Sequence, residues 1–190
     1  MRRGIPMRRL LLGLALLLPS QGWAAELAAD NFDRADGGLG ANWTTVTGFS
    51  APAIRTNVVE DNAVGGAASI ALRTAEAFPD DQYAQLTVKA AVTSNGRVVA
   101  ATLRGVTTAR THYECQVAGP LGATATLTTV RYNAGAGTTL AGGTAIYTVA
   151  ANDVLYCEII GSTITLKING TTILGPTVQG TPITRRDPGI

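Results

Sequence analysis

Apolar and polar residues alternate with a period of two along most of the second half of the chain. This period places successive side chains on opposite faces of a β-strand, whereas a helix repeats every 3.6 residues. After residue 24, no window of ten or more residues shows an apolar stripe at helical spacing. We therefore predict strands separated by turns, and the clearest are residues 67–74, 83–92, 97–106, 111–117 and 125–133.

The sharpest local pattern lies in residues 154–174. Gly161-Ser162 suits a two-residue type II′ turn, and Asn169-Gly170 suits a type I′ turn. The two turns fix a register that pairs Leu155 with Ile168, Cys157 with Leu166, Ile159 with Ile164 and Ile160 with Thr163.

This register sorts the side chains of the hairpin onto two faces. One face is apolar, with Leu155, Cys157, Ile159, Ile164, Leu166 and Ile168. The other face is polar, with Tyr156, Glu158, Thr165 and Lys167. A sheet with one apolar and one polar face covers a core on one side only.

Three glycine-containing stretches separate or end the predicted strands. Ser94-Asn95-Gly96 predicts a hairpin between residues 83–92 and 97–106, and residues 134–144 predict a flexible loop because they lack large side chains. The chain ends just after Pro188-Gly189, which predicts a turn in front of a missing final strand. We predict a single all-β domain over residues 25–190, an antiparallel two-sheet sandwich of jelly-roll type.

The first 24 residues have the pattern of a secretory signal peptide. Four arginines, at positions 2, 3, 8 and 9, precede the apolar run Leu10–Leu18, and Ala24 ends a stretch suited to signal peptidase. The apolar run is shorter than the roughly 20 residues of a membrane span. We expect cleavage near Ala24, no membrane span afterwards, and a secreted, periplasmic or cell-surface location.

Removal of that segment changes the sign of the net charge. The chain has 15 Lys and Arg and 13 Asp and Glu, and four of the arginines lie in residues 1–24. The remaining chain therefore has 11 basic and 13 acidic residues, a net charge of −2. No basic patch remains beyond Arg185-Arg186, so the composition argues against a nucleic-acid partner.

Residues 30–43 combine acidic, glycine and aromatic residues. The alternate aspartates of an EF-hand loop are missing, because Arg34 and Phe32 occupy those positions before Asp36. The pattern F-x-R-x-D-G-x-L-G-x-N-W at residues 32–43 resembles the start of domains in the concanavalin A-like lectin/glucanase superfamily, including laminin G-like modules. Residues 155–173 resemble the late strand pair of the same family.

The resemblance implies two antiparallel sheets, one of them curved, with ligands across the concave face. Family members often hold calcium near the joined chain ends, which implies Asp30 as a metal ligand. They include lectins, glycan-binding modules, adhesins, structural surface proteins and glycoside hydrolases. The Glu-x-Asp-x-(x)-Glu string of the glucanase members is absent here.

The two cysteines lie at core-facing positions of different predicted strands. In an exported chain Cys115 and Cys157 can form a disulfide, and the alternative is two buried thiols. If their strands were antiparallel neighbours, Glu114 would face Glu158 about 5 Å away. Opposed carboxylates at this separation match retaining glycosidases, whereas a surface ion pair with Lys167 is the simpler explanation of Glu158.

Other catalytic sites have little support in the sequence. His112 is the only histidine, it lacks a Gly-x-Ser-x-Gly partner motif, and a strand histidine near a Thr and a Tyr is usually a surface or edge residue. We expect ligand contacts from Tyr156, Glu158, Lys167 and Glu114. The leading expectation is a secreted, non-catalytic module that binds extracellular or cell-wall carbohydrate. A structural or adhesive surface protein is the alternative, and a glycoside hydrolase or polysaccharide lyase is third.

Overall fold

The computed structural model describes residues 26–62, 68–89, 98–119, 122–180, 183 and 187–189. Within these ranges every regular element is a β-strand, and the strands form three sheets with antiparallel neighbours. This part of the chain has no helix of the length and apolar character that a membrane span requires. The prediction of an all-β sandwich is confirmed, while the predicted signal peptide lies outside the described residues.

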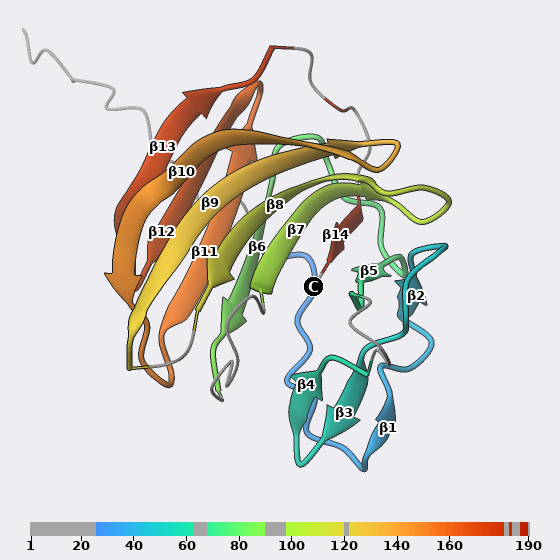
Figure 1. The fold of residues 1–190 in the computed structure, drawn as a ribbon. Coiled ribbons are helices and arrows are strands. Elements are labelled where there is room, and N and C mark those ends of the chain that lie inside the picture. The colour runs from blue at the N-terminus through green and yellow to red at the C-terminus, as the bar shows by residue number, and fades with distance from the viewer. Residues whose placement is uncertain are drawn as a thin grey trace, which may run out of the picture.

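The larger sheet of the sandwich has seven strands in the order β10-β9-β8-β7-β14-β5-β2 (Figure 1). Its four long, bent strands are β7 (Val98–Val106), β8 (Thr111–Ala118), β9 (Thr124–Asn133) and β10 (Ala136–Thr148). Its three short strands are β14 (Asp187–Gly189), β5 (Ala71–Arg73) and β2 (Trp43–Thr45).

The second sheet has four strands and lies behind β7–β10 in Figure 1. It consists of β13 (Thr171–Val178), β12 (Thr163–Ile168), β11 (Val154–Ile160) and β6 (Gln82–Thr87), in this order. The β11–β12 register agrees with the prediction at every pair named above. Asn169 and Gly170 both have positive φ, 49° and 78°, as a type I′ turn requires.

The main core lies between these two sheets. Its members at 0% exposure are Ala101, Leu103, Tyr113, Cys115, Ala125, Leu127, Cys157, Ile159, Ile164 and Leu166. A disulfide joins Cys115 of β8 to Cys157 of β11, with their Cα atoms 5.7 Å apart. The predicted disulfide is present, and it ties one sheet to the other through the core.

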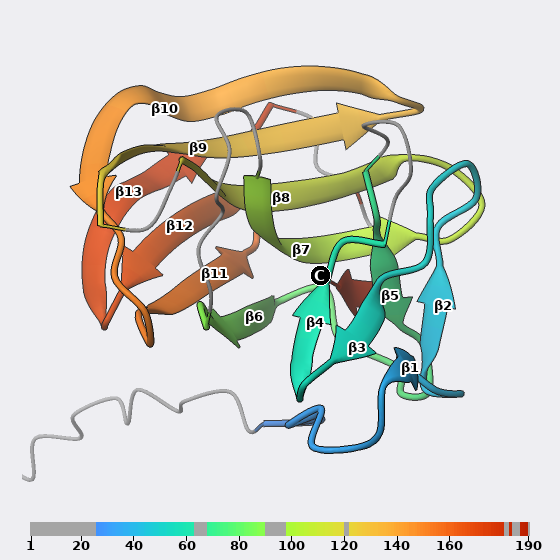
Figure 2. The ribbon, with the colours of Figure 1, turned by 60° about the horizontal axis from the view of Figure 1, so that its bottom comes forward.

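A third, small sheet stands beside the sandwich and contains β1 (Gly37–Gly38), β3 (Ala53–Arg55) and β4 (Val58–Glu60). Figure 2 shows it next to β2 and β5, away from the long strands. Its own small core contains Leu39, Ile54 and Ala71, with Phe32 and Trp43 packed against them.

The prediction of a flexible loop at residues 134–144 is wrong. Residues 136–144 belong to β10, which pairs with β9 from Ala136 to Thr148, and only residues 134–135 form the turn between the two strands. Two register shifts, between Thr139 and Ala141 and between Gly142 and Ala145, interrupt the alternation that would reveal a strand. Gly142 has φ +102°, and a Cβ there would lie 2.1 Å from the Leu127 carbonyl oxygen, so glycine permits the close pairing.

The predicted hairpin between residues 83–92 and 97–106 and the predicted turn at Pro188-Gly189 are also wrong. Strands β6 and β7 belong to different sheets, so residues 83–92 and 97–106 are not a hairpin. The proposed turn at residues 94–96 lies outside the described residues. Pro188 and Gly189 do not form a turn before a missing strand, because Asp187–Gly189 is itself strand β14 between β7 and β5.

One end of the sandwich is tied together by Arg104 of β7, whose side chain is 3% exposed. Its guanidinium donates hydrogen bonds to the carbonyl oxygens of Asp80 at 2.7 Å, Gly161 at 2.8 Å and Ile183 at 3.3 Å. A single buried cation thereby connects the chain before β6, the β11–β12 turn and the segment that leads to β14.

Candidate functional site

Asp30 is the polar centre of the opening stretch. Its carboxylate accepts hydrogen bonds from the Phe32 amide at 2.9 Å, from two Arg34 nitrogens at 2.7 and 3.1 Å, and from Trp43 Nε1 at 2.9 Å. Partial burial acts to raise the pKa of Asp30, but the bonds from Arg34, Trp43 and Phe32 outweigh it and lower the pKa to about 2.

This environment does not fit a calcium ion. Calcium takes six to eight oxygen ligands, whereas every partner of Asp30 named above is an N–H donor, one of them a cation. In the ranges that the structure describes, no group of three His, Cys, Asp or Glu side chains could hold a metal. The role of Asp30 is to fix Arg34 and Trp43 over the small core, with the Phe32 and Trp43 rings 5.7 Å apart.

Glu114 and Glu158 do not form the opposed pair considered from the sequence. The cross-strand neighbours of Glu114 are Thr102 and Val130, and those of Glu158 are Tyr83 and Thr165. Because Cys115 and Cys157 face each other across the core, the glutamates next to them point away from it on opposite sides of the sandwich. Stacked sheets lie about 10 Å apart, so the two carboxylates are farther apart than any glycosidase pair.

On the outer face of the seven-stranded sheet, polar side chains form a connected row. His112 Nε2 lies 2.5 Å from Glu114 Oε1, Gln116 donates to Glu114 Oε2 at 2.5 Å, and Thr128 donates to Gln116 at 3.0 Å. We call these four residues the polar row. Although it belongs to an outer face, His112 is 0% and Glu114 5% exposed, so the prediction of a surface histidine is wrong.

The carboxyl group of Glu114 is held in its ionised form. Burial acts to raise its pKa, but the hydrogen bond and charge of His112, the Gln116 bond and the Arg110 charge together lower it. Both carboxylate oxygens have a donor within the polar row. Glu114 therefore has its charge compensated inside the protein.

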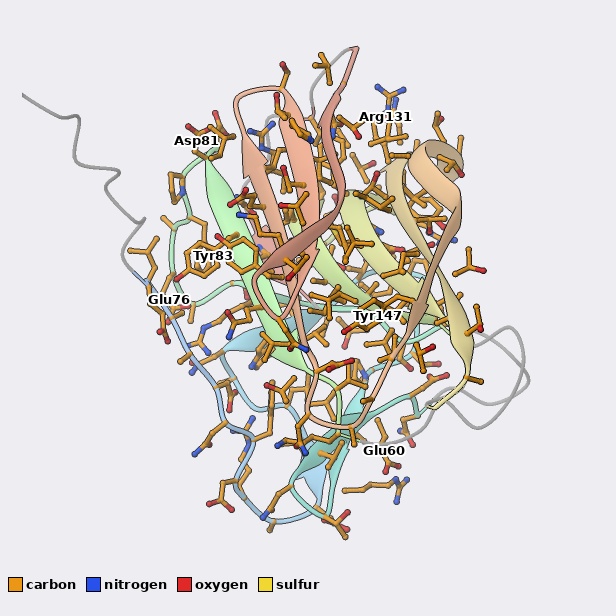
Figure 3. All side chains as sticks on the ribbon, turned by 90° about the vertical axis from the view of Figure 1, so that its left-hand side faces the viewer. Glu60, Glu76, Asp81, Tyr83, Arg131 and Tyr147 are labelled. Carbon is orange, nitrogen blue, oxygen red and sulfur yellow. A yellow bond between two sulfur atoms is a disulfide. The ribbon has the colours of Figure 1, made fainter. Side chains whose placement is uncertain are left out.

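The outer face of the four-stranded sheet carries a second cluster, which we call the tyrosine face: Tyr83, Tyr156, Glu158 and Lys167. The Tyr83 and Tyr156 rings stack with centroids 5.3 Å apart and planes at 21°. Lys167 Nζ lies 2.9 Å from Glu158 Oε1 and 5.0 Å from the Tyr156 ring centroid. In Figure 3, Tyr83 projects from β6 to the side away from the seven-stranded sheet.

The tyrosine face is ordered by its own contacts and stays partly open to solvent. Burial, together with the charge and hydrogen bond of Glu158, raises the pKa of Tyr156 to about 12. Tyr156 is therefore a neutral ring whose hydroxyl is tied to Glu158. At one end of the same face, Ile160 and Val178 are 60% and 75% exposed and flank Thr163 in a single cross-strand row.

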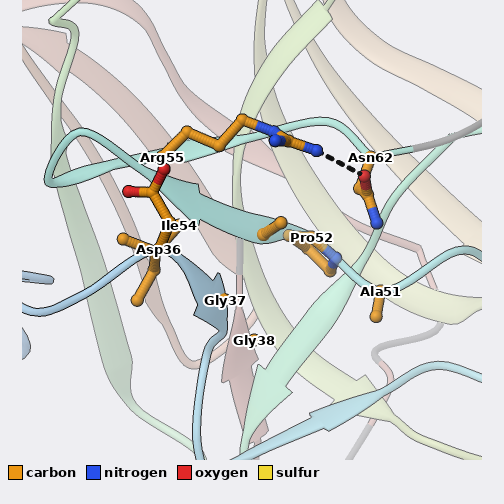
Figure 4. Close-up of a pocket in the computed structure, with 9 residues that line it drawn as sticks. Asp36, Gly37, Gly38, Ala51, Pro52, Ile54, Arg55 and Asn62 are labelled. Atoms are coloured by element: carbon orange, nitrogen blue, oxygen red, sulfur yellow. Dashed lines mark hydrogen bonds between the residues drawn. The ribbon is translucent and has the colours of Figure 1, made fainter.

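A hollow of about 450 Å³ lies over the small sheet (Figure 4). Pro52 and Ile54 contribute apolar surface, and Arg55 crosses it to reach Asn62 Oδ1 at 3.2 Å. Asp36, which also lines the hollow, accepts a hydrogen bond from the Thr56 amide at 2.8 Å. The arginine and the aspartate thus already have partners in the protein.

Three of the four predicted ligand-binding residues, Tyr156, Glu158 and Lys167, lie together on the tyrosine face. Glu114 lies on the other side of the sandwich, in the polar row. Tyr83, which completes the tyrosine face, alternates with core positions in β6, but its strand partner is not evident from the sequence. Arg110, near the polar row, is not marked by any motif.

Comparison with known proteins bears on the fold alone. No family model matches the sequence, and no curated protein matches it. Among solved structures, the chain is similar to carbohydrate-binding module CBM66 from Bacillus subtilis, with a TM-score of 0.58 and 18% identity over 78% of this chain and 85% of that one. LamAcat from Zobellia galactanivorans aligns with a TM-score of 0.49 and 10% identity, over 84% of this chain and 92% of that one. The chain therefore has the jelly-roll sandwich fold of the first of these structures.

Proposed function

We propose that this domain is a non-catalytic module that binds a carbohydrate chain across the outer face of its four-stranded sheet. The observation that carries the proposal is the stacked, partly exposed Tyr83–Tyr156 pair beside the Lys167–Glu158 ion pair. One solved structure with a similar fold is a carbohydrate-binding module, which agrees with the proposal, and at 18% identity this likeness supports the fold only.

The chemistry of this face suits a sugar. Aromatic rings offer flat apolar surface to sugar C–H groups, and charged side chains at their edge donate to and accept from hydroxyls. The mutual stacking of Tyr83 and Tyr156 fixes both rings before a ligand arrives, so little side-chain entropy is lost on binding. Four strands about 4.8 Å apart give a face about 15 Å wide, enough for several sugar units.

We infer an extracellular or periplasmic location for the same domain. The arginine and leucine pattern of residues 1–24 supports export, and a disulfide persists in an oxidising compartment. A hydrolase has less support than a binding module, because the carboxylate pair on which it depended is divided between two faces.

The test is retention of the purified chain on a panel of neutral polysaccharides, with released reducing sugar measured in the same tubes. We expect retention on at least one of them without sugar release. Tyr156→Ala should weaken the binding at least tenfold, because it removes the central ring and its stacking on Tyr83. Tyr156→Phe keeps the ring and should stay within about threefold of the wild type, since only the hydroxyl contact is lost.

A control variant on another surface separates a local effect from a general one. Lys89→Ala lies outside the tyrosine face, with its ammonium group on Asn152, and should bind like the wild type. Equal binding by Tyr156→Ala and wild type would contradict the proposed face. No retention on any glycan would favour the structural or adhesive alternative, for which the exposed Ile160 and Val178 offer a contact surface.

A further inference from the structure

Arg110, in the turn between β7 and β8, contacts two aromatic rings. Its guanidinium carbon lies 3.6 Å from the ring centroid of Tyr132 on β9 and 5.3 Å from that of Phe49, which follows β2. The Tyr132 ring also lies 5.1 Å from the His112 ring. The two rings fix the guanidinium plane beside the polar row, on the face of the sandwich opposite the tyrosine face.

The guanidinium of Arg110 has no acceptor among the described residues. Its Nε is buried without a hydrogen-bond partner, while the terminal nitrogens are not among the buried unpaired atoms and so remain open to solvent. Four other arginines differ in this respect. Arg34 bonds Asp30, Arg73 bonds Glu76, Arg55 bonds Asn62, and Arg104 bonds three carbonyl oxygens. The two aromatic contacts of Arg110 therefore hold its terminal N–H donors in place while these donors stay open to a ligand from solvent.

Glu114 does not serve as the acceptor. Its charge acts on Arg110 from a distance, but both of its oxygens are bonded by His112 and Gln116, and no ion pair joins it to Arg110. His112 adds a second unsatisfied group, since its Nδ1 is buried without a partner. Both oxygens of Glu114 are thus occupied by other donors, although the charge of Arg110 contributes to the lowered pKa of Glu114.

We propose that Arg110 forms an anion-binding site for the carboxylate of an acidic sugar unit, such as a uronic acid. A guanidinium presents two parallel N–H donors that match a carboxylate, and a fixed plane in a partly buried setting strengthens the pair. The choice of a sugar as the carrier of the carboxylate rests on the proposed function. The site itself is separate from the tyrosine face, because the two lie on opposite sides of the sandwich.

The experiment is calorimetric titration of the full chain with oligogalacturonate and with its methyl ester, at low and high salt. We expect the free acid to bind at least tenfold more tightly than the ester, with affinity falling as salt rises. Arg110→Gln should lose this preference. Arg110→Lys keeps the positive charge but loses the two parallel N–H donors of the guanidinium, and should retain only part of the preference for the free acid.

Arg55→Gln is the matched control, because it removes an exposed arginine that already bonds Asn62. It should bind oligogalacturonate within twofold of the wild type. Equal losses in both arginine variants, or equal binding of acid and ester, would overturn the site. Circular dichroism shows whether each variant is folded. If Arg110→Gln does not fold, the affinity of Arg110→Lys for the free acid and the ester tests the site instead.

Further titrations identify which class of anion binds and separate the Arg110 site from the proposed function of the tyrosine face. Tighter binding of dextran sulfate than of oligogalacturonate, or equally tight binding of a tetraglutamate peptide, would contradict a uronate site. Tyr156→Ala should leave the oligogalacturonate affinity unchanged. If it abolishes that affinity, the acidic glycan binds at the tyrosine face and the Arg110 site is refuted while the proposed function stands.

Discussion

The Cys115–Cys157 disulfide should be the largest single covalent contribution to stability. It joins residues 42 positions apart and connects the two sheets through the core. In the chain-entropy model, a cross-link that closes a loop of this length destabilises the unfolded chain by about 4 kcal/mol at 25 °C. For a domain of this size, that difference corresponds to a fall in Tm of roughly 10 °C when the bond is absent.

The cleanest perturbation keeps both sulfur atoms. The protein is unfolded, reduced and refolded in reductant, so that two buried thiols replace the bond with little change in core volume. Urea unfolding of the oxidised and reduced forms should give a difference of about 4 kcal/mol, with a larger m-value for the reduced form because its unfolded chain is more expanded. Thiol titration in denaturant verifies each redox state.

Equal unfolding free energies for two forms whose redox states the thiol assay has verified would refute a stabilising cross-link. A Cys115→Ala/Cys157→Ala double variant provides a second measurement. Its unfolding free energy should fall by the contribution of the cross-link and by somewhat more, because removal of the two fully buried sulfur atoms leaves a cavity in the core. Greater stability of this variant than of the reduced wild type would contradict the packing argument.

Two further predictions concern buried polar contacts. Arg104→Lys should lower the unfolding free energy by about 3 kcal/mol in urea titrations, because one ammonium group cannot reach the carbonyls of Asp80, Gly161 and Ile183 together. An unfolding free energy equal to that of the wild type would show that these three hydrogen bonds do not stabilise the fold. The folded state lowers the pKa of Asp30 from 3.8 to about 2, so the ionised carboxylate stabilises the fold by up to about 2 kcal/mol. This contribution is complete above the unfolded pKa near 3.8 and is lost as the pH falls through 2. Asp30→Asn should remove this acid-dependent part of the stability, and an unchanged profile between pH 5 and pH 2 would show that the carboxylate is not bonded as described.

The parts of the fold that the sequence predicts well are those in which turn chemistry and period agree. Asn169-Gly170 and Gly161-Ser162 fix a register over strands that alternate without a bulge, so every predicted pair from residue 155 to residue 168 is present. Strand β10 shows the opposite case. Its two register shifts change the phase of the alternation, so the period of two is lost although its partner β9 directly precedes it in the chain. Gly142 is required by the close approach of the β9 backbone at Leu127, which is known only once the shifted register is known.

The same limit explains the outcome for the candidate sites. The period of two predicts which face of its sheet a residue occupies, and it correctly places Cys115 and Cys157 toward the core. It does not predict which sheet each strand joins. The sequence therefore does not distinguish cysteines paired on neighbouring strands of one sheet from cysteines paired across the core. The first arrangement would bring Glu114 and Glu158 together, and the second separates them. The tyrosine face could be predicted in large part because most of it lies within one hairpin. The environment of Arg110 could not, because Phe49 and Tyr132 reach it from separate parts of the chain. That its guanidinium has no acceptor within the described ranges is likewise visible only in the folded arrangement.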